Sequence, residues 1–114
     1  MTRHSDETRL RHMLDHATEA VQMMRSRPRR DLDSDRQLNL ALVRLMEIVG
    51  EAASHVSQPA QGRLPGIPWP SIIGLRNRLV HGYDEVDLDV LWQILQVDLP
   101  PLILELRKAL GEEA

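Results

Sequence analysis

The sequence predicts an all-α fold, a four- to five-helix up-and-down bundle formed by a single domain over residues 1–114. Two observations support this prediction. Apolar residues recur at steps of three and four through long stretches of the chain, which is the periodicity of amphipathic helices. No stretch shows a convincing alternation with a period of two, which would indicate a half-buried strand. A chain of 114 residues is long enough to bury one core.

The first helix is expected from Ser5 to about Arg25, where apolar residues repeat at helical spacing. Ser5 or Asp6 can act as its N-cap, since both side chains accept hydrogen bonds from first-turn N–H groups. His12 and His16 lie four residues apart and share a face. Such a pair could bind a metal, but no Glu-x-x-His pattern accompanies it, so a solvated helix edge is the better interpretation.

A second helix is expected over residues 34–57, after a short basic loop that follows a proline. Arg44, Glu47 and Glu51 are spaced so that both acids neighbour each other and the arginine along one edge. Gly50 costs about 1 kcal/mol relative to alanine in a helix interior. Its presence predicts that another backbone approaches closely there, and a simple packing notch without function explains it equally well.

Prolines and glycines predict a loop of about a dozen residues over 59–70. Trp69 near its end is interpreted as an anchor that pins the loop to the bundle. A third helix is expected from about Pro70 to His81, with Gly82 as its C-cap.

A fourth helix is expected to begin after a cap at Asp87 or Asp89 and to continue to the C-terminus. Pro100 and Pro101 should kink or interrupt it, because proline lacks the N–H that an interior helical position needs.

Charge and composition exclude several classes of function. The formal net charge is −3 and the pI is near 5.9, so no overall basic field attracts nucleic acid. Thirteen of the fourteen basic residues are arginine, which a GC-rich coding sequence explains most simply. The chain has no cysteine, which excludes disulfides, thiolate catalysis and cysteine-based zinc sites. It shows no signal peptide and no apolar run of membrane-spanning length, and a cytoplasmic location is expected.

The side chains best suited to catalysis or to binding an anion are concentrated in one short stretch near residue 80. The stretch holds two guanidinium groups, a carboxamide, an imidazole and a phenol: Arg76, Asn77, Arg78, His81 and Tyr83. Arginine can clamp a phosphate and stabilise the negative charge of a phosphoryl transition state, and histidine can exchange a proton near neutral pH. Residue types alone favour a simpler interpretation, a helix end at which His81 interacts with the last carbonyl groups.

The stretch from Gly74 to Tyr83 resembles the Arg-x4-His-x-Tyr signature of HepT-like proteins in the HEPN superfamily. The resemblance covers roughly residues 10–110 and includes four further segments in the same order: Arg44–Ala53, Ile67–Gly74, Val86–Asp87 with Trp92, and Asp98–Pro100.

This resemblance implies a HEPN-like bundle and a toxin of a type VII toxin–antitoxin pair, a HEPN/MNT system in bacteria or archaea. Such a toxin is a ribonuclease that needs no metal or other cofactor, and it forms a homodimer whose signature segments meet in a cleft. Its antitoxin is an MNT-type nucleotidyltransferase that silences it by AMPylation of the signature tyrosine, here Tyr83. The RNA substrate could be messenger RNA or transfer RNA.

The resemblance also implies roles for the signature residues. Arg76 would bind the scissile phosphate, and His81 would act as general base or acid. Asn77 would orient the imidazole or the phosphate, Arg78 would add positive charge for the substrate, and Tyr83 would contact RNA and accept AMP. Two alternatives stay open: a non-catalytic HEPN module that docks a nucleotidyltransferase, and a structural dimerisation domain.

Overall fold

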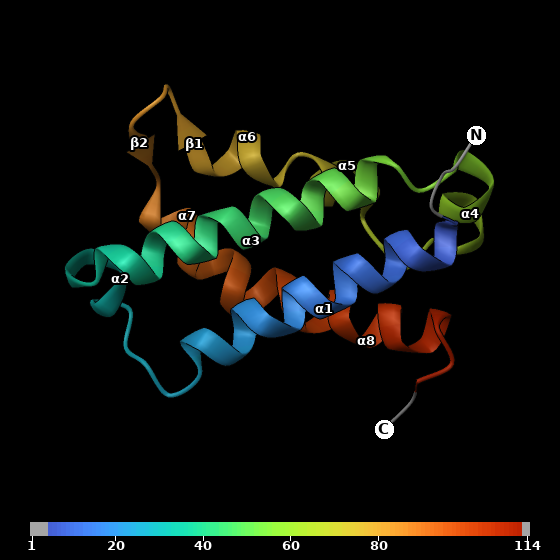
Figure 1. The fold of residues 1–114 in the computed structure, drawn as a ribbon, viewed down its shortest axis with the longest axis horizontal. Helices are drawn as coiled ribbons and strands as arrows, with labels where there is room; N and C mark the ends of the chain where they lie inside the picture. Colours follow the sequence, from blue (N-terminus) through green and yellow to red (C-terminus); the bar gives the residue numbers. More distant parts are fainter. Residues whose placement is uncertain (1–4, 113–114) are drawn as a thin grey trace.

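Two long antiparallel helices, α1 (Asp6–Met24) and α3 (Arg36–Ser54), form the centre of the fold in the computed structural model, which describes residues 5–112. Helix α8 (Leu99–Ala109) packs against α1, and the helical segment over residues 69–79 packs against α3 (Figure 1). Helices therefore make up most of the fold, and the all-α prediction is confirmed. No helix within residues 5–112 is long and apolar enough to cross a membrane.

Helix α1 begins at its predicted cap, Ser5, and α3 begins two residues after the predicted start at residue 34. The Ser5 hydroxyl accepts a hydrogen bond from the Thr8 N–H at 3.1 Å, and the Asp35 carboxylate accepts one from the Leu38 N–H at 3.0 Å. Each side chain thus satisfies one of the N–H groups that a helix start leaves without a backbone partner. A short helix, α2 (Asp31–Ser34), precedes α3 and was not expected.

The predicted loop over residues 59–70 contains another unexpected helix, α4 (Gln58–Arg63). Ser57 caps it, and the Asp6 carboxylate accepts two hydrogen bonds from Ser57, from the N–H at 2.9 Å and from the hydroxyl at 2.6 Å. The anchor role of Trp69 is confirmed: the ring is buried and its indole N–H donates to the Leu64 carbonyl at 3.1 Å.

The third predicted helix, over 70–81, is wrong in its course and its end. The segment forms two short helices, α5 (Trp69–Ile73) and α6 (Leu75–Leu79), and the chain then leaves the helical conformation at Val80.

A small antiparallel hairpin follows α6, which contradicts the expectation that the chain has no strand. It consists of β1 (Val80–His81) and β2 (Glu85–Val86), with Val80 opposite Val86 and His81 opposite Glu85. Strands of two residues are too short for a period of two to appear in the sequence. Gly82, with a φ of 79°, is not a helix C-cap and instead lies in the hairpin turn, where a left-handed conformation favours glycine.

The last part of the chain is one continuous helical run, from α7 (Leu88–Gln93) through the π-helical segment η1 (Ile94–Asp98) into α8. Asp87 is its N-cap, as predicted, and accepts the Val90 N–H at 3.0 Å. Pro100 and Pro101 lie in the first turn of α8. The wider π turn directly before them accommodates the two residues that cannot donate a backbone hydrogen bond.

Candidate functional site

An open cleft of about 500 Å³ lies between α3 and the α5–α6 segment. It is lined by Arg44, Glu47, Gly50, Glu51, Ser54, Ile73, Arg76 and Asn77. The floor is tight at Gly50, where an added Cβ would lie 3.1 Å from the Ile72 carbonyl oxygen and 3.3 Å from that of Ile73. The predicted close approach of another backbone to Gly50 is therefore confirmed, and it positions the start of α6 beside the cleft.

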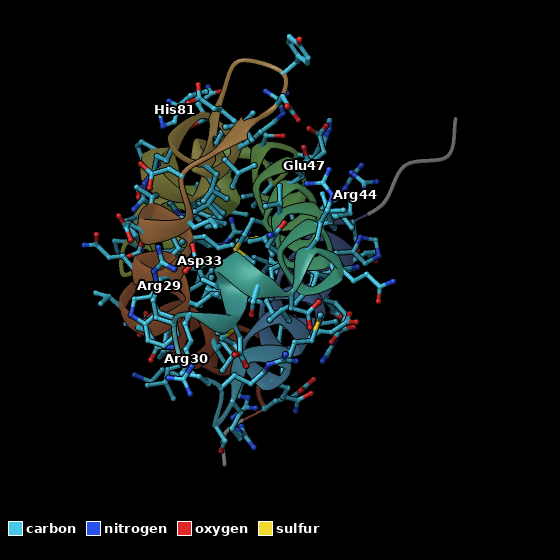
Figure 2. The ribbon with its side chains drawn as sticks, turned by 90° about the vertical axis from the view of Figure 1, so that its left-hand side faces the viewer. Arg29, Arg30, Asp33, Arg44, Glu47 and His81 are labelled. Carbon is cyan, nitrogen blue, oxygen red and sulfur yellow. The ribbon has the colours of Figure 1, made fainter. Side chains whose placement is uncertain are left out.

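Arg76 reaches into this cleft from α6 and faces a carboxylate on α3. Its Nε atom lies 3.4 Å from Oε2 of Glu47, and the other carboxylate oxygen of Glu47 lies 3.5 Å from Nη1 of Arg44. Figure 2 shows Arg44 and Glu47 side by side on α3. The Arg76 side chain is 60% exposed, so its guanidinium group is accessible to an anion that enters the cleft.

Arg78 points in a different direction from Arg76, because residues two apart on a helix are separated by about 200°. Its Nη1 atom donates to the Ser71 hydroxyl at 3.1 Å and lies 2.9 Å from the Asp98 carboxylate. These contacts tie α6 to α5 and to η1, so Arg78 has a clear structural role.

His81 lies on β1, beside the start of α7. Its Nε2 atom is 3.8 Å from Oδ2 of Asp87, which is too far for a hydrogen bond but gives the imidazole a carboxylate neighbour. The His81 side chain is 58% exposed. Asn77, which was expected to orient either His81 or the phosphate, lines the cleft. Among the described residues, no hydrogen bond joins Asn77 to His81.

Tyr83 lies at the tip of the hairpin and is fully exposed. Its ring therefore projects away from the bundle, next to the positive-φ residue Gly82. The phenol is open to solvent and to another macromolecule.

The structure brings only part of the signature into one place. Arg76 and Asn77 share the cleft with Arg44 and Glu47, whereas His81 is not among the lining residues. Figure 2 shows His81 on the hairpin, apart from Glu47. Within one chain, the group suited to hold a phosphate thus lines the cleft, and the group suited to move a proton does not.

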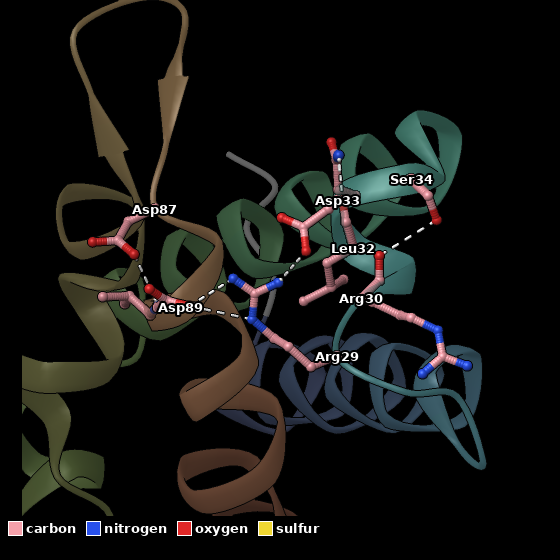
Figure 3. A network of polar contacts seen from close by, with 9 residues as sticks. Arg29, Arg30, Leu32, Asp33, Ser34, Asp87 and Asp89 are labelled. Carbon is pink, nitrogen blue, oxygen red and sulfur yellow. Dashed lines mark hydrogen bonds and ion pairs between the residues drawn. The ribbon is translucent and has the colours of Figure 1, made fainter.

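An ion-pair network ties the loop after α1 to the segment that carries Asp87 (Figure 3). Arg29 donates to Asp33 of α2 at 2.7 Å and to Asp89 of α7 at 2.6 Å. The hydrogen bond with Asp89 raises the pKa of the Arg29 guanidinium above its ordinary value. The network holds α7, and with it the cap residue Asp87, against the α1–α3 connection.

The sequence did not predict two of the contacts in the site. The edge formed by Arg44, Glu47 and Glu51 was predicted, but its contact with Arg76 was not. Asp87 was predicted as a cap and not as the neighbour of His81.

No three His, Asp or Glu side chains gather as a possible metal site in the part of the chain that the structure describes. His16 Nδ1 lies 2.7 Å from the His12 carbonyl oxygen at a half-exposed helix edge.

Comparison with known proteins identifies relatives over most of the chain. A family model for HepT-like ribonucleases matches residues 13–109. The chain is 35% identical over 72 residues to a protein of Thermococcus cleftensis named "Probable ribonuclease HepT". This match covers 63% of this chain and 66% of the relative.

Two further relatives carry names that describe them as candidate RNases. One, from Methanocaldococcus jannaschii, is 28% identical over 90 residues, or 79% of this chain and 83% of the relative. The other, from Caldanaerobacter subterraneus, is 27% identical over 104 residues, or 91% and 93%. No solved structure matches the chain. Because the family model spans most of the sequence, the chain belongs to the HepT-like ribonuclease family.

Proposed function

We propose that this chain is the toxin of a HEPN/MNT toxin–antitoxin pair and that it cleaves RNA without a metal ion, at a cleft completed by a second copy. The observation that carries the proposal is the exposed Arg76 guanidinium in an open cleft, five residues before an exposed His81. Membership of a ribonuclease family makes a phosphodiester the natural anion for this cleft.

In the proposed reaction, Arg76 binds the scissile phosphate through its Nη atoms and stabilises the extra negative charge of the transition state. A His81 imidazole removes the proton of the ribose 2′-hydroxyl, whose oxygen attacks phosphorus. The bond from phosphorus to the 5′-oxygen breaks, and an imidazolium returns a proton to that oxygen. The products are a 2′,3′-cyclic phosphate and a 5′-hydroxyl. Asn77, which lines the same cleft, helps to orient the phosphate.

The geometry of one chain supports a homodimer. Arg76 lines the cleft and His81 does not, and the signature contains one histidine for a reaction that needs both a base and an acid. Two copies that meet along this segment supply two imidazoles and two copies of Arg76 to one cleft. Light scattering at tens of micromolar, a typical range for weak association, should give twice the mass of 13.0 kDa. A monomer under these conditions contradicts the shared cleft.

The direct test is RNA cleavage by the purified protein in excess EDTA. Wild type should cleave susceptible RNA and leave 2′,3′-cyclic phosphate ends, and Arg76→Ala and His81→Ala should each lose activity by roughly 10²-fold or more. Glu105→Gln removes a half-buried carboxylate of α8 that pairs with Lys108, and it serves as the control with wild-type activity. Activity that EDTA abolishes and magnesium restores refutes the metal-free mechanism. A folded wild type that cleaves no RNA but captures the nucleotidyltransferase supports the non-catalytic docking module instead.

The regulatory part of the proposal concerns Tyr83. The MNT-type antitoxin transfers AMP from ATP to the Tyr83 oxygen, with release of pyrophosphate. The fully exposed phenol supports this assignment, because a second active site can reach it without any refolding of the bundle. The added phosphate would compete for the arginines that hold the RNA backbone. Intact mass after co-expression should show one or more AMP units that Tyr83→Phe removes. An adduct that survives this substitution places the switch elsewhere.

A further inference from the structure

We infer that Glu47 is a positioning residue for Arg76: it holds the guanidinium by its Nε side and leaves the Nη side free for the phosphate. This inference rests on the proposed ribonuclease function, which assigns Arg76 to the scissile phosphate. It adds a residue that lies outside the signature, on another helix and 29 positions earlier in the chain.

The contacts of Arg76 carry the inference. Its exposed side chain has several rotatable bonds and would otherwise sample many positions over the cleft. Glu47 approaches it most closely at Nε, at 3.4 Å, and the Arg76 side chain remains 60% exposed beside this contact. A phosphate can therefore bind the free side of the fork while the carboxylate holds the other side.

Glu47 itself is held in place. Its side chain is only 30% exposed, it extends from the middle of α3, and its second oxygen lies 3.5 Å from Nη1 of Arg44. One carboxylate thus bridges two arginines and reduces their mutual repulsion. The Gly50 contact with α5 fixes how closely α6, and therefore Arg76, approaches this carboxylate.

Removal of the negative charge of Glu47 distinguishes a role in positioning Arg76 from a role in binding RNA. Arg44, Glu47 and Arg76 together carry one net positive charge, and Glu47→Gln raises it to two. RNA binding should then be unchanged or tighter, with a steeper dependence on salt concentration. Turnover should fall, because the arginine that stabilises the transition state is no longer held in position.

The experiment measures kcat and KM for RNA cleavage with wild type, Glu47→Gln, Glu47→Asp and the control Glu105→Gln. Glu105 matches Glu47 well, since it is also a half-buried helix glutamate that pairs with a cation three positions away, at 3.6 Å. Glu47→Gln should lower kcat by roughly 10- to 100-fold, as displacement of a catalytic group by ~1 Å does, without raising KM. Glu47→Asp should recover part of kcat, and Glu105→Gln should match wild type. A wild-type kcat for Glu47→Gln, with Arg76→Ala inactive, overturns the inference.

A second measurement does not depend on activity. In a two-dimensional ¹H–¹⁵N NMR spectrum, the Arg76 Nε–H signal can be assigned as the one that Arg76→Lys removes. This signal should shift in Glu47→Gln and stay in place in Glu105→Gln. If it does not shift, the inference is overturned whatever the activity. If it shifts while wild type cleaves no RNA, the positioning contact stands and the proposed ribonuclease function fails.

Discussion

Gly50→Ala tests whether the close approach of α3 and α5 shapes the cleft. The new Cβ would lie 3.1 Å and 3.3 Å from two backbone carbonyl oxygens, those of Ile72 and Ile73. These oxygens cannot rotate away as the end of a side chain could. They belong to a short helix that the buried Trp69 anchors to the core, so the two helices must separate by a few tenths of an ångström.

Two opposing effects decide the size of the change. Alanine gains about 1 kcal/mol over glycine in a helix interior. Overpacking of a tight contact costs about 1–3 kcal/mol. The free energy of unfolding should therefore fall by about 1 kcal/mol, because both close neighbours of the new Cβ are backbone atoms, which yield less than a flexible side chain. Displacement of α5 also moves the start of α6, so RNA cleavage should decrease as well.

The assay is urea unfolding of wild type, Gly50→Ala and the matched control Gly62→Ala. Gly62 lies in helix α4, has no heavy atom within 4 Å of an added Cβ and does not have a positive φ. The control should therefore be stabilised by about 0.4–1 kcal/mol. If Gly50→Ala is stabilised as much as Gly62→Ala, the α3–α5 approach is not tight and the reasoning fails.

Three further substitutions test caps, the loop anchor and the hairpin tip. The hydrogen bond from the Leu38 N–H lowers the pKa of the Asp35 carboxyl, and the ion pair with Arg27 lowers it further. The Asp35 carboxylate therefore stabilises the fold above the unfolded pKa of about 3.9. Asp35→Ala should therefore lower the melting temperature at pH 7, and the difference should vanish as pH falls through the folded pKa. Trp69→Phe should lower the unfolding free energy by about 1–2 kcal/mol in urea unfolding, because the Leu64 carbonyl loses its indole donor. Tyr83→Ala should change it by less than about 0.5 kcal/mol, since the side chain is fully exposed, while AMP addition in intact mass is lost.

The long helices were predictable because their signals are local. Apolar spacing and the caps Ser5 and Asp35 lie within a few residues of the structure that they specify. Helix α4 has a cap at Ser57 but lacks the apolar spacing, since Ala60 is its one buried residue. Its start depends on hydrogen bonds from Ser57 to Asp6, which lies 51 positions earlier in the chain.

The end of the third helix shows the same limit at the site itself. Leu79, Val80 and His81 are compatible with a helix that continues to Gly82. The extended conformation of Val80 and His81 depends on pairing with Glu85 and Val86, and on the hydrogen bond from the Asp87 N–H to the Leu79 carbonyl at 2.8 Å. These partners compete with the helical hydrogen bonds, and a local pattern does not decide between them.

The sequence by itself determined that the chain is helical, which residues are candidates for catalysis and which family signature they form. Spacing of apolar residues and residue types are properties of the chain before it folds. Only the tertiary structure decided that Arg76 faces Glu47, that Arg78 turns to Asp98, and that His81 does not line the cleft that holds Arg76. Both ion pairs join helical segments that are separated in the sequence, and their distances follow from how these segments pack against the common core.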